Sequence, residues 1–403
     1  MKNVLNTPVT DGITRREGLL LTVLGSAMAL AGCGGGGGGG SAGVSSGGTG
    51  SFSSGPIAGF GSIIVGGIRF EDATASSILD VDDDNRDMRG KLKLGMMVRV
   101  KGKPKNGDRA DADSIEVRSE LLGPIASIDA SAKTLVVLGQ TVQVTTTTIF
   151  EDGLTGLPAL AVNDIVEVHG FVDPVTNRLT ATRVERKLLA SVKAFKLQGT
   201  ISALDTTAKT FKIGTLTISF AAPVDIPAGL TLANGMLVRV RLEPVLTSGT
   251  RKALKIRQVE VEVEDRDEAE IEGTITAFTS SSKFSVNGQP VDATGVTVPA
   301  GLKLGDRVEV EGSLVNGVLV AKKVEREDEN DPLKLELHGA IGSLNTTAKT
   351  FVLRGVTVDY STTTDFRPAG KTAADLANGV SVEVKGVASA DGTQLKAARI
   401  SFE

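Results

Sequence analysis

The chain has 403 residues and is almost balanced in charge, with 44 Lys and Arg against 48 Asp and Glu. One Cys excludes an internal disulfide and a thiolate metal site, and two His leave little for a His-rich site. A net charge of −4 and 3% aromatic residues argue against a nucleic-acid partner, which needs a basic field and stacking rings. We therefore expect no metal, no cofactor and no nucleic acid, and at this length we expect several domains.

Residues 1–32 are predicted to be a lipoprotein signal peptide. Arg15 and Arg16 precede an apolar run from Leu19 to Ala31, which is shorter than the roughly 20 residues that span a bilayer. The run ends in the sequence Leu-Ala-Gly-Cys at 30–33, which resembles the bacterial lipobox. That resemblance implies lipidation of Cys33 and anchoring in the membrane. The alternative is an incidental thiol after an ordinary signal peptide.

The export route and the destination are read from the residues on either side of Cys33. The segment 14–20 resembles a twin-arginine motif but has Gly18 where that motif prefers Phe, so a Sec signal fits equally well. Gly34, rather than Asp, follows Cys33, and we therefore expect the outer membrane, facing the periplasm or the cell surface. Residues 33–54 are rich in Gly and Ser and are predicted to be a flexible tether.

Two independent markers predict five tandem repeats of about 70 residues each in the rest of the chain. A G-x-I element recurs at Ile57, Ile125, Ile201, Ile275 and Ile341. A V-x-V element recurs at 98–100, 166–168, 238–240, 308–310 and 382–384. The predicted repeats are 55–120, 121–190, 195–265, 268–331 and 333–403.

Each repeat is predicted to be all-β. In the fourth, Asn287-Gly288 is a strong hairpin signal, and Val308, Val310 and Leu314 alternate with polar residues. Leu319, Ala321 and Val324 then break the alternation, as do the equivalent residues of every repeat, which indicates a β-bulge. We therefore expect five small antiparallel β-barrels of OB type, folding as separate domains. A short flat sandwich is the alternative.

This pattern resembles a family of bacterial envelope lipoproteins built from tandem copies of a small β-barrel domain of unknown function. The resemblance is carried by the G-x-I starts, by the V-x-V elements and by turns such as Asp205 to Thr210 and Asn345 to Thr350. Two departures are Asn163, at a turn glycine, and Leu242, where the other repeats have Gly after V-x-V. The resemblance implies no known activity.

Few polar residues stand out as candidates for chemistry. His169 and His338 are expected to be exposed strand residues, because they occupy non-equivalent repeat positions. The acidic loop Asp80–Asp87 resembles the start of a calcium loop but lacks its Gly and its final Glu, so we expect a solvated loop without tight calcium binding. The acidic runs Glu264–Glu270 and Glu325–Asp331 are expected to be solvated linkers.

No set of nucleophile, base and oxyanion donors can be assembled, so we expect no enzyme activity, no catalytic residues and no cofactor-binding residues. The favoured hypothesis is a lipid-anchored envelope protein that acts as a structural or interaction module, with an envelope protein or a glycan as partner. The alternative hypothesis is binding of a small ligand or an oligosaccharide by the β domains.

Overall fold

A computed structural model describes residues 52–105, 109–151, 153–259, 265–327, 331, 334–389 and 393–403. The predicted signal peptide, Cys33 and the tether up to residue 51 lie outside the described residues. The described residues belong to one compact unit. The described chain consists of β-strands and short 3-10 turns, and it contains no helix long and apolar enough to cross a membrane.

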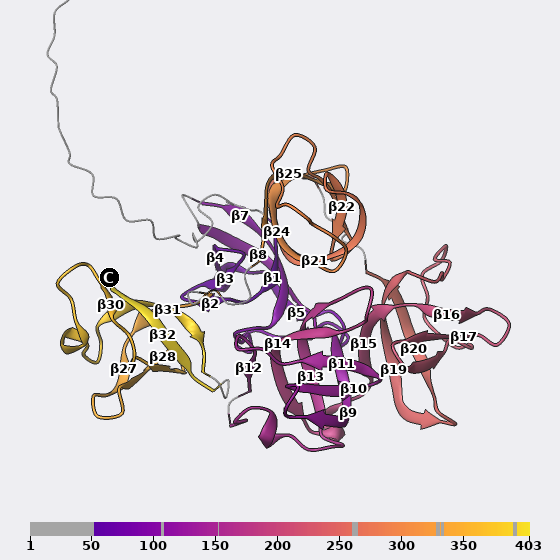
Figure 1. Ribbon diagram of the computed structural model, residues 1–403, viewed down its shortest axis with the longest axis horizontal. Helices are drawn as coiled ribbons and strands as arrows, with labels where there is room; N and C mark the ends of the chain where they lie inside the picture. The colour runs from indigo at the N-terminus through magenta and orange to yellow at the C-terminus, as the bar shows by residue number, and fades with distance from the viewer. Residues whose placement is uncertain are drawn as a thin grey trace, which may run out of the picture. The chain divides into compact units, whose positions relative to one another are not determined.

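The strands fall into five groups, called repeats 1 to 5 below and coloured from indigo to yellow along the chain (Figure 1). Repeat 1 contains β1 (Phe52–Pro56), β2 (Gly59–Phe60), β3 (Ile63–Val65), β4 (Ile68–Glu71), η1 (Asp72–Thr74), β5 (Ser77–Asp80), β6 (Arg86–Asp87), β7 (Met97–Pro104) and β8 (Arg109–Val117). Repeat 2 contains β9 (Leu121–Asp129), β10 (Thr134–Val137), β11 (Gln140–Gln143), β12 (Ile149–Phe150), η2 (Leu157–Ala159), β13 (Ile165–Val172) and β14 (Leu179–Lys187), and η3 (Leu189–Ser191) follows it.

The remaining three repeats have the same order of strands. Repeat 3 contains β15 (Phe195–Thr200), β16 (Ser202–Asp205), β17 (Thr210–Ile213), β18 (Leu216–Ser219), β19 (Leu237–Thr247) and β20 (Thr250–Gln258). Repeat 4 contains β21 (Arg266–Ser280), β22 (Lys283–Val286), β23 (Gln289–Asp292), β24 (Arg307–Val315) and β25 (Val318–Arg326). Repeat 5 contains β26 (Leu335–Ala340), β27 (Gly342–Asn345), β28 (Thr350–Leu353), β29 (Val356–Asp359), β30 (Asp365–Arg367), η4 (Ala373–Asp375), β31 (Ser381–Ala388) and β32 (Leu395–Phe402).

Local sequence signals explain the turns. Asn287 and Gly288 both take positive φ values, of 48° and 84°, as a type I′ hairpin between β22 and β23 requires. Asn163, which replaces a turn glycine, also has a positive φ, of 73°. Val308, Val310 and Leu314 are buried, as the period-two pattern of β24 predicts. These predictions about turns and alternation are confirmed.

The predicted β-bulge is confirmed in all five repeats. The V-x-V strand and the closing strand of each repeat shift register at Gly102, Gly170, Leu242, Gly312 and Gly386. In repeat 2, a Cβ on Gly170 would lie 2.1 Å from the carbonyl oxygen of Thr180 on the partner strand. The bulge therefore brings two backbones so close that only glycine fits without a shift. Leu242 stands at this place in repeat 3, where β19 shows a second register shift before Leu246.

The prediction of five small antiparallel β-barrels is wrong. The strands are arranged as a β-solenoid of about nine turns rather than as small closed barrels. The pairings are also mixed, since β4, β11 and β23 each pair in parallel with the closing strand of their repeat.

The expectation of separate domains fails because strands hydrogen-bond across repeats. β1 pairs in parallel with β21 of repeat 4, β2 pairs in parallel with β26 of repeat 5, and β9 pairs with β15 of repeat 3. The described strands consequently join into one sheet of 20 strands and one of 12. The apolar cores follow the same grouping: repeats 1 and 5 share one cluster, repeats 2 and 3 share another, and Phe52 of β1 belongs to the core of repeat 4.

The close approach at the bulge predicts a strong effect of Gly170→Ala. The added methyl group would meet the Thr180 carbonyl, and overpacking of this kind costs roughly 1–3 kcal/mol. We expect a lower midpoint of thermal unfolding, measured by circular dichroism. Gly342→Ala is the matched control, because the nearest atom to its Cβ, the Val352 carbonyl oxygen, is 3.7 Å away. Equal midpoints for the two variants would contradict this account of the bulge.

Candidate functional site

The most unusual feature of the molecule is a set of charged side chains buried where repeats meet. Three such regions are distinguished below. The 1–2–3 junction contains Asp80, Glu167 and Lys196, which come from repeats 1, 2 and 3. The 1–5 junction contains Arg69 and Glu336, and the 1–4 junction contains Glu270.

Lys196 is the centre of the 1–2–3 junction. Its Nζ atom lies 3.1 Å from Asp80 Oδ2, 3.3 Å from Glu167 Oε1 and 3.1 Å from Ser119 Oγ. All four residues are at least nine-tenths buried, so water does not screen these charges. Burial opposes the charged form of Lys196, but the two carboxylates outweigh it and raise the pKa of the ammonium. The cluster therefore links three repeats through one lysine and two acidic side chains.

The acidic loop of repeat 1 is part of this junction, so the expectation of a solvated loop is wrong for its first residues. Asp82 binds Arg239 of β19, and Asp84 binds Arg241 of the same strand at 2.5 Å. Burial raises the pKa of Asp82, but the charges of Arg239, Lys196 and Arg118 together outweigh burial and lower it overall. Cationic side chains of repeat 3 engage these carboxylates, and the absence of tight calcium binding stays a prediction.

His169 also belongs to the 1–2–3 junction, and the expectation that it is exposed is wrong. Its side chain is buried against the connection between repeats 1 and 2, with Nδ1 2.8 Å from the carbonyl oxygen of Arg118. Burial disfavours the imidazolium and lowers the pKa of His169. Strand alternation does place His169 on the outer face of its own repeat. Repeat 1 covers that face.

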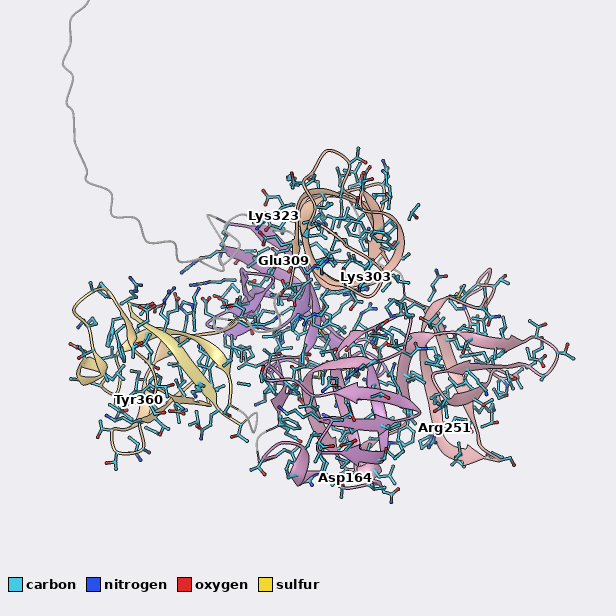
Figure 2. All side chains as sticks on the ribbon, viewed as in Figure 1. Asp164, Arg251, Lys303, Glu309, Lys323 and Tyr360 are labelled. Carbon is cyan, nitrogen blue, oxygen red and sulfur yellow. The ribbon has the colours of Figure 1, made fainter. Side chains whose placement is uncertain are left out.

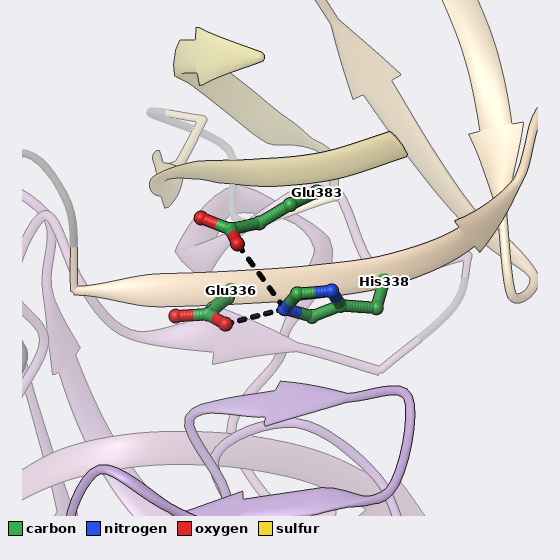
Figure 3. Close-up of side chains that lie close together, drawn as sticks. All are labelled: Glu336, His338 and Glu383. Atoms are coloured by element: carbon green, nitrogen blue, oxygen red, sulfur yellow. Dashed lines mark hydrogen bonds and ion pairs between the residues drawn. The ribbon is translucent and has the colours of Figure 1, made fainter. Parts of the chain in front are cut away.

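At the 1–5 junction, His338 is also buried rather than exposed. Figure 3 shows its ring beside the carboxylates of Glu336, on the same strand, and of Glu383, on β31. Nε2 lies 2.5 Å from Glu336 Oε1, and Nδ1 lies 2.6 Å from Glu403 Oε1. Burial lowers the pKa of His338, but its hydrogen bonds to Glu336 and Glu403 outweigh burial and raise it. The carboxylates on either side of the ring therefore favour its protonated form.

The same three side chains have a possible metal-binding geometry, since their ligand atoms lie within 4.8 Å of one another. The donors are, however, engaged by cations of the chain. Glu336 Oε1 accepts a hydrogen bond from Arg69 of repeat 1 at 2.6 Å, and its Oε2 atom lies 2.9 Å from Lys385 Nζ. A metal ion would need a neutral His338 and would compete with two positive charges. The arrangement therefore fits an ion-pair network that joins repeats 1 and 5.

The 1–4 junction differs because it is made of carboxyl groups. Glu270 of β21 is completely buried against repeat 1, where a Cβ on Gly66 would lie 2.6 Å from its Oε1 atom. Burial and the neighbouring Glu309 raise the pKa of Glu270 well above its usual value. Burial also raises the pKa of Glu309, labelled on repeat 4 in Figure 2, to about 8. Burial and the proximity of like groups therefore favour the protonated form of both carboxyl groups.

The expectation that the acidic runs are linkers is wrong where they enter strands, and the expectation that they are solvated is wrong for Glu270 but not for the exposed Glu325. Residues 266–270 form the start of β21, and Glu325 and Arg326 end β25. Residues 260–264 and 328–330 lie outside the described residues. One sequence signal for the 1–2–3 junction was available. At the middle position of V-x-V, repeat 3 has Arg239, whereas repeats 2, 4 and 5 have Glu. The two-residue spacing of Arg239 and Arg241 also matches the spacing of Asp82 and Asp84.

Comparison with known proteins gives one family. The model of the family described as Domain of unknown function (DUF5666) matches residues 53–116, 123–185, 272–325 and 338–401, together more than half of the chain. The matched ranges fall in repeats 1, 2, 4 and 5, and repeat 3, which carries Leu242 at the bulge, lies outside them. Tandem copies of a domain of unknown function are thereby confirmed. No curated protein matches the chain.

The raised pKa of Glu309 predicts that stability falls as pH rises. The unfolded chain releases this proton near pH 4.5, whereas the folded chain keeps it up to about pH 8, so the stabilisation is complete below pH 4.5 and is lost between these values. We expect Glu309→Gln to flatten the dependence of the unfolding midpoint on pH between 5 and 8.5. Glu325→Gln, at an exposed carboxylate of the same repeat, is the control and should leave it unchanged. An unaltered slope in Glu309→Gln would contradict the assignment.

Removing Lys196 should weaken the whole molecule. Lys196→Met leaves the buried carboxylates of Asp80 and Glu167 without their shared cation, and breaking a buried pair in this way costs roughly 3–5 kcal/mol. Chemical denaturation followed by circular dichroism measures the loss. Lys212→Met removes an exposed ammonium from the same repeat and should cost little. A similar small loss in both variants would show that the cluster does not hold the junction.

Proposed function

Since the chain belongs to the DUF5666 family, whose description names no activity, we propose that it is an exported, lipid-anchored envelope protein that acts as a structural or interaction module. One observation supports this role most directly: backbone hydrogen bonds and buried ion pairs tie repeat 1 to repeats 3, 4 and 5. Such an array can present several surfaces at a fixed spacing from a single anchor. An array of this kind needs no catalytic site to perform this role.

The proposal includes the absence of catalysis. Several buried polar groups at the junctions are engaged with one another: Lys196 with Asp80 and Glu167, and Arg69 with Glu336. Groups held in this way stabilise contacts between repeats and are not free to act as a nucleophile or a base.

The proposed anchor is a lipid on Cys33, as its lipobox position suggests, with the Gly/Ser-rich tether placing the β repeats away from the membrane. Gly34 after Cys33 supports the outer membrane as the destination, facing the periplasm or the cell surface. The proposed partner is an envelope protein or a glycan.

A second candidate function is binding of a small ligand or an oligosaccharide. Cavities at the junctions favour it; one of about 300 Å³ lies at the 1–5 junction, where Arg69, Arg109 and Arg354 line it. A glycan array probed with the purified chain tests this candidate: a selective signal supports glycan binding, and no selective signal supports a structural role or an envelope-protein partner.

Substitution of Cys33 tests the anchor. Cys33→Ser should abolish labelling by a radioactive fatty acid and leave an uncleaved or soluble precursor in cell fractionation. Ser41→Ala, in the tether, is the matched control and should remain lipidated and membrane-bound. The proposal fails if Cys33→Ser still resists washing from membranes in the absence of detergent and neither the native chain nor the variant carries a labelled acyl chain.

A further inference from the structure

Four glutamates form a compact group on the outer face of repeat 4, where strand β1 of repeat 1 lies beside β21. Glu270 of β21 stands directly opposite Glu311 of β24, and Glu272 stands directly opposite Glu309. Like charges at opposite positions of paired strands repel one another and destabilise a sheet. The folded chain must therefore neutralise these four side chains, which are called the glutamate patch below.

Two members of the glutamate patch are paired with cations of the chain. Glu272 Oε1 lies 2.8 Å from Arg307 Nη2 and 3.5 Å from Lys334 Nζ. Glu311 Oε1 lies 2.9 Å from Lys323 Nζ. Half of the patch is thus neutralised by ion pairs.

Glu270 and Glu309 form no ion pair with a cation in the part of the chain that the structure describes. Glu270 is 0% exposed, and no amide, ammonium, guanidinium or hydroxyl group among the described residues donates a hydrogen bond to either of its carboxylate oxygens. The Glu309 carboxyl lies within hydrogen-bonding reach of it, and burial raises the pKa of both groups. Buried polar atoms without partners are rare in folded proteins. This pair therefore requires either a proton or a bound cation.

Repeat 1 adds an oxygen atom beside Glu270. Ser53 is completely buried and pairs with Glu270 in the parallel register of β1 and β21. The position that a Cβ on Gly66 would occupy is 2.6 Å from Glu270 Oε1 and 3.1 Å from Ser53 Oγ, so glycine at this place leaves the space beside both oxygens open. The Ser53 hydroxyl donates to the Val65 carbonyl oxygen at 3.0 Å, and its own oxygen keeps lone pairs for a cation.

We propose that the glutamate patch binds a calcium ion between repeats 1 and 4, through the carboxylates of Glu270 and Glu309 and the hydroxyl of Ser53. Calcium takes oxygen ligands in flexible arrangements at roughly 2.3–2.6 Å, and two bidentate carboxylates with one hydroxyl supply about five of them. Oxygens of carboxyls within hydrogen-bonding reach need to separate by less than about 1 Å to share such an ion. Magnesium fits less well, because it keeps several of its waters and this site is buried.

A calcium ion at this place takes over the role of the proton. It neutralises both carboxylates at a pH at which they would otherwise repel one another, and it holds repeat 4 against repeat 1. The scarcity of Cys and His, on which the expectation of no metal rests, has no bearing on a site made of oxygen ligands.

This inference goes beyond the proposed function, and its test does not depend on lipidation of Cys33. The full chain, purified in a non-ionic detergent and freed of divalent cations with a chelator, is titrated with calcium chloride and separately with magnesium chloride by isothermal calorimetry at pH 8. We expect saturable binding of one calcium ion per chain, tighter than that of magnesium. Calcium should also raise the unfolding midpoint, and more at pH 8 than at pH 5.5, because it competes with protons for the carboxylates. No saturable binding of calcium, or tighter binding of magnesium, would overturn the proposal.

Isosteric variants decide whether the glutamate patch is the site. Glu270→Gln and Glu309→Gln should each weaken calcium binding about tenfold or more, because an amide carries no negative charge. Both should fold at pH 8 in the presence of chelator, since burial favours a neutral side chain at these positions. Circular dichroism melts of each variant check this.

Asp292→Asn is the matched control, because it removes a carboxylate of the same repeat on β23, outside the patch, and it should bind calcium like the native chain. Equal affinities for Glu270→Gln and Asp292→Asn would contradict the proposal. So would a loss of binding in Asp84→Asn instead of the patch variants, which would place the calcium ion in the acidic loop of repeat 1.

Discussion

Hydrogen bonding between strands of different repeats is the constraint on which the rest of the structure depends. β1 has β7 of its own repeat on one side and β21 of repeat 4 on the other. β9 likewise pairs with β13 inside repeat 2 and with β15 of repeat 3. Exposed strand edges carry unpaired backbone donors and acceptors, and pairing between repeats satisfies them. Once these edges are joined, the outer faces of the strands are covered as well.

Covering those faces buries charged side chains. The junctions offset the free-energy cost of this burial in two ways. At the 1–2–3 and 1–5 junctions, cations and anions from different repeats neutralise one another, as Lys196 does with Asp80 and Arg69 with Glu336. At the 1–4 junction a neighbouring group is the carboxyl of Glu309, and burial instead favours the protonated form of Glu270. The first solution pairs opposite charges. The second makes the contact between repeats 1 and 4 dependent on pH.

The candidate sites were harder to predict than the strands. His169 and Glu167 alternate with buried valines, which correctly places them on the outer face of repeat 2. The period-two pattern, however, says nothing about whether another repeat lies on that face. The same reasoning failed for Glu270, whose acidic neighbours resemble a solvated linker although β1 lies against it. A run of charged residues in a sequence indicates a solvent-exposed segment only when no other part of the chain packs against it.

By itself, the sequence determined the five-fold repetition, the β structure, the Asn-Gly turns and the bulge, because each depends on residues close together in the chain. The spacing of Leu319, Ala321 and Val324 in the sequence already predicts the register shift between β24 and β25. The sequence did not determine the joining of β1 to β21, more than 200 residues away, or the meeting of Asp80 with Lys196. Those contacts depend on which strand edges and faces come together, and only the tertiary structure decides that. The separate-barrel prediction failed for this reason: local alternation is the same whether a strand edge faces water or another repeat.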